Sequence, residues 1–170
     1  VNRERQSIEH HRFPDFSRYV EEHNPLIVMN NTKVLPAKLS GRMQGREKPV
    51  EMILVEETTR ATWLALVKGL ARFKPGMEIY FGEPSDGLKA VFLASDKGLG
   101  AFRFECRGDL AEALDRLGLP PLPPYVRRQE RNQAQDLLDR ERYQTLYASE
   151  PGAIAAPTAG LHFTDELLGK

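Results

Sequence analysis

Short apolar runs separated by polar turns dominate the middle of the chain. From residue 50 to 106 they recur about every dozen residues and read VEMILV, ATWLALV, MEIYF, LKAVFLA and AFRFEC. In the last run Phe102, Phe104 and Cys106 alternate with charged residues, which is the two-residue period of a half-buried strand. KPG, GEPSDG and DKGLG lie between the runs and have turn compositions. Several short strands at this spacing predict a small closed or nearly closed β-barrel.

The segment before the strand-rich region is first polar and then apolar. A short helix is expected around Phe16 to Glu22, ended by Asn24 and Pro25. Leu26 to Met29 form a compact aliphatic run that is typical of a buried strand. Val34 to Leu39 predict a second strand after the polar break NNTK.

Helical patterns appear only after the strand-rich region. Asp109 can cap a helix over LAEALDRL, and Gly118 can end it. The next stretch, LPPLPPYVRR, is rich in proline, and we interpret it as a stiff connector between folded units. DRERYQTLYA at 139–148 predicts a helix with Tyr143 and Tyr147 on one face.

Composition and charge narrow the classes of function. Lys and Arg number 24, as do Asp and Glu, so an RNA-binding face must be local rather than a property of the whole chain. Cys106 is the only cysteine, which excludes an internal disulfide and leaves no thiolate cluster for zinc. The aliphatic run at 26–29 is far shorter than the roughly 20 residues that span a bilayer. We therefore expect a cytoplasmic protein that binds neither membrane nor metal.

Three segments place polar side chains where chemistry could occur. The first, NNTK at 30–33, follows the aliphatic run, although the pattern alone favours an Asn-rich turn. The second, DRERYQT at 139–145, offers donors and a phenol, but its charges also fit a solvated helix face. The third, AAPTAGLHFT at 155–164, predicts a tight turn that holds Thr158 and His162. A lone His is more often structural than catalytic, so spacing alone assigns no role to His162.

Other polar groups have simpler explanations. His10 and His11 lie in a polar segment with no pattern of carboxylates or thiols that would complete a metal site. The glycines of 98–100 lack the third glycine of a dinucleotide loop, so we interpret them as a hairpin turn. Arg127 and Arg128 could hold phosphates, although neighbouring carboxylates favour a solvated face.

Four motifs in order and at their spacing carry a family resemblance: LIVMNNTKVLPAKLSG, LPPLPPY, DRERYQTLYA and GAIAAPTAGLHFT. They closely resemble the S-adenosylmethionine:tRNA ribosyltransferase-isomerase family of queuosine biosynthesis, from about residue 8 onward. The resemblance implies a mixed α and β, multidomain fold, in which an α/β barrel-like domain is interrupted by a small β-barrel. Residues 1–39 plus 126–170 would form the first domain and residues 40–125 the second. It also implies that the chain is a fragment, lacking the extreme N-terminus and the C-terminal half, and inactive by itself.

The resemblance implies an enzyme that is both a transferase and an isomerase. It would move the ribosyl moiety of S-adenosylmethionine onto 7-aminomethyl-7-deazaguanine at the wobble position, in the anticodon region of tRNA. The product would be epoxyqueuosine-tRNA, with release of adenine and methionine. S-adenosylmethionine would be consumed as a substrate, with no further cofactor. The alternatives are a non-catalytic RNA- or ligand-binding β-barrel module and a structural barrel without a ligand.

Within this resemblance His162 is the candidate for proton transfer, because an imidazole titrates near neutral pH. The candidates for substrate binding are Asn30, Thr32, Tyr143, Gln144, Thr158 and Gly160. Arg127 and Arg128 are the candidates for RNA binding. Lys33 and Lys38 stand where the family usually has Arg, so a bidentate contact with an anion would become a contact with a point charge.

Overall fold

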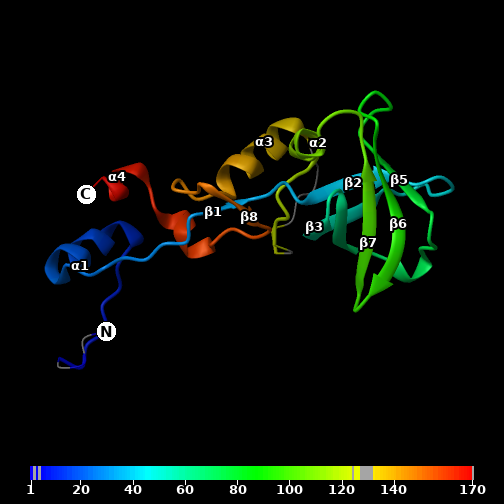
Figure 1. The fold of residues 1–170 in the computed structure, drawn as a ribbon. Helices are drawn as coiled ribbons and strands as arrows, with labels where there is room; N and C mark the ends of the chain where they lie inside the picture. The colour runs from blue at the N-terminus through cyan, green and yellow to red at the C-terminus, as the bar shows by residue number, and fades with distance from the viewer. Residues whose placement is uncertain (2, 4, 124, 127–131, 170) are drawn as a thin grey trace.

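The structure is a computed structural model that describes residues 1, 3, 5–123, 125, 126 and 132–169. It contains both helices and strands, as expected. Figure 1 shows the strand-rich part at one end of the molecule and α1, α4 and both termini at the other. The elements in chain order are η1 (Phe13–Asp15), α1 (Phe16–His23), β1 (Thr32–Val34), β2 (Lys38–Arg42), β3 (Val50–Thr59), β4 (Thr62–Val67), η2 (Leu70–Arg72), β5 (Glu78–Phe81), β6 (Leu88–Asp96), β7 (Leu99–Glu105), α2 (Leu110–Leu117), α3 (Gln133–Arg142), β8 (Glu150–Ala153), η3 (Thr158–His162) and α4 (Asp165–Leu168).

Six antiparallel strands form a closed barrel in the order β2-β3-β4-β7-β6-β5. Buried and more exposed side chains alternate along β2, β5 and β7 and along the first halves of β3 and β6. The largest fully buried ones are Phe102, Leu39, Met52, Ile79 and Leu88. A Cβ at position 41 would lie 2.5 Å from Cγ2 of Ile79, which explains a glycine inside β2. The barrel predicted from the strand spacing is confirmed, as is the hairpin turn between β6 and β7.

Strand β1 pairs in parallel with β8, although the two are far apart in the sequence. Thr32 lies opposite Glu150, and the backbone N–H of Leu35 donates to the carbonyl oxygen of Ala153 at 2.8 Å. Residues 35–37 alone separate β1 from the first barrel strand, and they include Pro36. The parallel sheet therefore lies directly beside the barrel (Figure 1).

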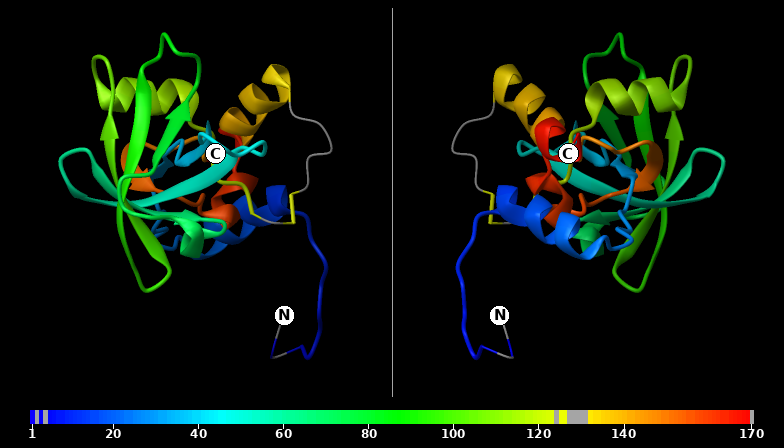
Figure 2. Two further views of the ribbon diagram at one scale, coloured as in Figure 1. Left: turned by 90° about the vertical axis from the view of Figure 1, so that its right-hand side faces the viewer. Right: turned by 90° about the vertical axis from the view of Figure 1, so that its left-hand side faces the viewer.

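Side chains cap the first turns of two helices, and both predicted ends of α2 are confirmed. Asp109 caps α2, since its Oδ1 accepts from the backbone N–H of Glu112 at 3.0 Å, and Gly118 follows the last turn. Thr164 caps α4 in the same way, accepting from Leu167 at 3.3 Å. Figure 2 shows α2 beside the barrel, where Ala113 is buried in the barrel core.

The predicted strand at 26–29 is wrong. The run lies outside any strand, and Leu26 and Val28 are 90% and 88% exposed. A buried parallel strand needs hydrogen-bonding neighbours and cover on both faces. The part of the chain that the structure describes places no strand beside this run. Thr32 and Lys33 consequently lie inside β1, and not after a strand as expected.

Two other elements also differ from their predicted positions. The helix expected at 139–148 is α3, which starts at 133 because Asn132 caps it and accepts from the N–H of Gln135 at 2.9 Å. It ends at Arg142, since Tyr143 takes φ −92° and ψ 39°, so Tyr143 and Tyr147 do not share a helical face. The strand expected at 34–39 is divided at Pro36 between β1 and β2.

The division into two domains stays a prediction. The boundary that it places at residue 40 falls inside β2, and the barrel strands run from Lys38 to Glu105. None of the helices within the described residues has the length and hydropathy that crossing a bilayer requires.

A charged network on the outer face of the barrel centres on Lys89. Its Nζ lies 2.7 Å from Oε1 of Glu78 and 3.2 Å from Oε2 of Glu105. The hydrogen bond from Lys89 is the main cause that holds the pKa of each carboxyl below its ordinary value of about 4.5. The hydrogen bond to Glu78 in turn raises the pKa of Lys89. A lowered carboxyl pKa adds stability above the pKa of the unfolded chain, and that stability is lost as the pH falls through the folded value.

We expect Lys89→Gln to lower the melting temperature slightly at about pH 7 and to have a smaller effect at about pH 3, where the carboxyls become protonated. Lys68→Gln is the matched control, because Lys68 is exposed and forms no ion pair within the described residues. Thermal unfolding of both variants at the two pH values checks this. An equal loss at both pH values would show that Lys89 acts through packing rather than charge.

Candidate functional site

The first two polar segments found in the sequence meet at the parallel sheet. Gln144 accepts at its side-chain oxygen from the backbone N–H of Val34 at 3.0 Å. Asn31 donates from its side chain to Oγ of Ser149 at 3.0 Å. The carbonyl oxygen of Asn31 also accepts from the N–H groups of Ser149 and Glu150 at 2.8 and 3.2 Å. The start of β1 is thereby tied to the residues that follow α3.

The third segment packs on the second through Gly160. This residue is buried within η3. A Cβ at position 160 would lie 2.9 Å from Cγ2 of Thr145 and would overlap the hydroxyl of Tyr147. Only glycine fits this contact without displacement, so the turn AAPTAGLHFT rests directly against the end of DRERYQT.

A hollow of about 350 Å³ lies where these two segments meet, and we call it the turn pocket. Its lining comprises Glu141, Arg142, Gln144, Thr145, Leu146, Gly160, Leu161 and Phe163. Glu141 and Arg142 are exposed, and neither forms an ion pair with a described residue. The pocket therefore offers a carboxylate, a guanidinium and an amide against an apolar wall.

Thr145 contributes the most unusual group of this lining. Its side chain is only 4% exposed, and its Oγ1 has no hydrogen-bond partner among the described residues. Buried hydroxyls in folded proteins almost always have a partner, because leaving one unpaired costs about 1–3 kcal/mol. The hydroxyl of Thr145 is thus the group most in need of a partner from a ligand or a water molecule.

His162 lies beside the turn pocket but outside its lining. It is exposed, and the centre of its ring lies 5.2 Å from that of Phe13, which comes from the N-terminal segment. Phe163 packs against the same segment, and the centre of its ring lies 5.0 Å from that of Phe13 and 5.8 Å from that of Phe16. His162 makes no side-chain hydrogen bond with any residue that the structure describes.

The other candidates for substrate binding divide between pockets and structural roles. Tyr143 is 9% exposed and packs against Val34, and with Gln144 it lines a smaller hollow of about 120 Å³. Asn30 accepts from the backbone N–H of Thr32 at 2.9 Å, which forms a local turn. Thr158 is exposed and lines none of these hollows.

The Lys and Arg side chains considered in the sequence analysis differ in whether they have an ion-pair partner. Nζ of Lys38 lies 2.9 Å from a carboxylate oxygen of Glu51, so this side chain has a partner. Lys33 is exposed without an ion pair within the described residues. Arg127 and Arg128 lie outside the described residues. In the part of the chain that is described, no three His, Cys, Asp or Glu side chains gather to hold a metal ion.

Sequence patterns missed Glu141, Arg142 and Thr145 as pocket residues. All three lie in DRERYQT, so the segment was found although its pocket residues were not. The helix ends at Arg142, and the chain that follows turns toward η3. Which side chains face the pocket depends on that turn and on the contact with Gly160, and neither has a signal in the local pattern.

A solved structure and a family model both match the chain. A solved structure, the crystal structure of S-adenosylmethionine tRNA ribosyltransferase from Thermotoga maritima, is 27% identical, with a TM-score of 0.35. The match covers 98% of this chain and 42% of that chain, so this chain spans less than half of that protein's length. A family model described as queuosine biosynthesis protein matches residues 1–170, and the chain therefore belongs to that family.

Proposed function

We propose that the protein transfers the ribosyl moiety of S-adenosylmethionine to 7-aminomethyl-7-deazaguanine at the wobble position of tRNA and isomerises it. The family match over residues 1–170 carries this proposal. A cytoplasmic location is part of the proposal, since the single cysteine suits a reducing compartment.

The turn pocket has a suitable composition for the donor substrate. S-adenosylmethionine carries a sulfonium, an ammonium and a carboxylate, so its site needs groups of both charges. Glu141 and Arg142 supply these in the lining, and Thr145 adds a hydroxyl without a protein partner. The apolar side chains of Leu161 and Phe163 complete the wall.

The proposed reaction requires proton transfer at two points. The sulfonium acidifies the adjacent 5′ carbon, so a base can remove a proton there, and an acid can protonate the departing adenine. His162 is our candidate for this transfer because it stands between Leu161 and Phe163, which both line the pocket. Glu141 is the carboxylate of the lining and the second candidate.

We expect the full-length protein that contains this chain to release adenine from S-adenosylmethionine only when tRNA carrying the deazaguanine base is present. Chromatographic detection of adenine tests this, with S-adenosylhomocysteine as the donor control and unmodified tRNA as the acceptor control. Tight tRNA binding without adenine release would favour a non-catalytic binding module instead.

In the full-length protein we expect His162→Ala to lower the single-turnover rate by roughly two to four orders of magnitude while S-adenosylmethionine affinity stays nearly unchanged. Phe13→Leu is the matched control, because it removes the ring contact with His162 but leaves the imidazole in place. The rate, the affinity and the melting temperature are measured on both variants. An equal loss of rate in both would assign His162 a packing role.

We expect Thr145→Val to weaken S-adenosylmethionine binding by about tenfold, because it removes the buried hydroxyl while keeping the shape of the side chain. Stability should not fall, since Oγ1 has no hydrogen-bond partner among the described residues. Thr145→Ser keeps the hydroxyl and should bind nearly as the wild type does. Calorimetric titration checks this, and unchanged affinity in Thr145→Val would remove the hydroxyl from the donor site.

A further inference from the structure

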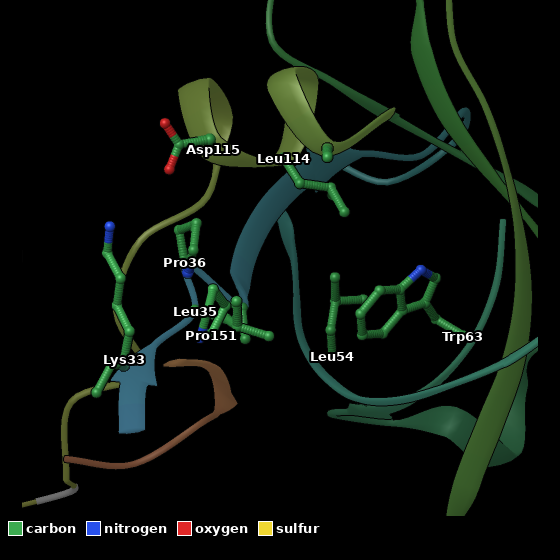
Figure 3. A pocket seen from close by; sticks show the side chains of 11 residues that line it. Lys33, Leu35, Pro36, Leu54, Trp63, Leu114, Asp115 and Pro151 are labelled. Carbon is green, nitrogen blue, oxygen red and sulfur yellow. The ribbon is translucent and has the colours of Figure 1, made fainter. Parts of the chain in front are cut away.

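A second hollow, of about 300 Å³, lies between the barrel and the parallel sheet, and we call it the tryptophan pocket. Its lining comprises Lys33, Val34, Leu35, Pro36, Ala37, Leu54, Trp63, Ala111, Leu114, Asp115 and Pro151. Figure 3 shows Trp63 beside Leu54 on one side and Lys33 with Asp115 on the other. Apart from these two charged groups the lining is apolar. It shares no residue with the turn pocket.

The indole of Trp63 presents carbon atoms to this pocket. Its Nε1 is buried and has no hydrogen-bond partner among the described residues, so the exposed part of the ring consists of carbon atoms. Leu54 and Leu114 add further apolar surface. An aromatic ring with aliphatic neighbours suits a flat heterocycle, because every nucleobase has an apolar face that stacks on such a surface.

The mouth of the pocket is positively charged. The hollow of about 120 Å³ adjoins the tryptophan pocket, since both are lined by Lys33 and Asp115, and it adds Arg140. Arg140 donates to the carbonyl oxygens of Arg116 (3.2 Å) and Gly118, which hold its guanidinium in place. Lys33 and Asp115 form no ion pair within the described residues. Two cations and one carboxylate suit a phosphate beside a base that carries an amino group.

We propose that the tryptophan pocket holds one unstacked nucleobase of an RNA strand, with the adjoining phosphate at Lys33 and Arg140. This inference rests on the proposed function, in which the acceptor is a tRNA base that must leave its stack to react. S-adenosylmethionine fits this pocket less well, because it has no phosphate and would bring a sulfonium and an ammonium to a cationic mouth. Gln144 lines both the smaller hollow and the turn pocket, so the place for the phosphate of the strand adjoins the place for the donor there.

The test uses Trp63, the only tryptophan of the chain, as an intrinsic fluorescent probe. Guanosine and guanosine 3′,5′-bisphosphate are titrated separately against the purified protein. Both should quench the fluorescence, since each places a purine beside the indole. The bisphosphate should bind about tenfold more tightly, because its phosphates accept charge-assisted hydrogen bonds at the mouth.

Two variants separate the base from the phosphate. Ala111→Phe fills the pocket from the exposed surface of α2 and should weaken both ligands at least about tenfold. Its control is Ala134→Phe, an exposed position of α3 outside the pocket lining. Lys33→Gln should remove most of the advantage of the bisphosphate and leave guanosine binding unchanged, with Lys68→Gln as its control.

Three results would overturn the inference: no quenching by either ligand, equal binding to Ala111→Phe and the wild type, or tighter binding of S-adenosylhomocysteine than of the bisphosphate. The last result would assign the pocket to the donor. Adenine release by a protein that fails the titration would refute this inference and leave the proposed function standing. Binding of the base without adenine release would support this inference and refute the proposed function.

Discussion

The parallel pairing of β1 with β8 is the interaction on which both pockets depend. It joins residues more than a hundred positions apart, and the bond between Asn31 and Ser149 lies at its edge. A pair of strands alone is marginally stable in water, so its neighbours must support it. Val34 does so by packing against Tyr143 and Ala156, and Gln144 does so by binding the N–H of Val34. Because Gln144 also lines the turn pocket, the sheet and the pocket form together.

Two backbone contacts close to that sheet fix the position of the barrel. The chain enters the barrel at Lys38 and returns to the same place at Leu119, where the two residues exchange backbone hydrogen bonds of 2.9 and 2.8 Å. Gly118 lies so close to the carbonyl of Pro36 that a Cβ there would overlap it. Short, fixed connections hold the barrel beside the sheet without filling the space between them. That space is the tryptophan pocket, which is lined from both sides.

Local patterns predicted the parts of the fold that local chemistry decides. Alternating side chains predicted the barrel strands, and Asp109 with Gly118 predicted both ends of α2. The aliphatic run at 26–29 misled, because its composition signals burial but a strand also needs a neighbour. Trp63 and Thr145 had no signal at all as pocket residues, since their surroundings arise from segments distant in the sequence. The family motifs identified the segments that form the turn pocket, but not which of their side chains face it.

The two pockets differ in charge in a way that suits a reaction between a cationic donor and an anionic strand. A sulfonium beside Lys33 and Arg140 would be repelled, whereas Glu141 in the turn pocket can attract it. The turn pocket has one carboxylate and one guanidinium, Glu141 and Arg142, whereas Lys33 and Arg140 outnumber Asp115 at the other site. In the proposed function this excess of positive charge favours the phosphate and disfavours the donor beside Lys33 and Arg140. In the proposed function Gln144 is fixed by its bond to Val34 and lies between the turn pocket and the smaller hollow, so the donor would adjoin the strand where the phosphate next to the bound base lies.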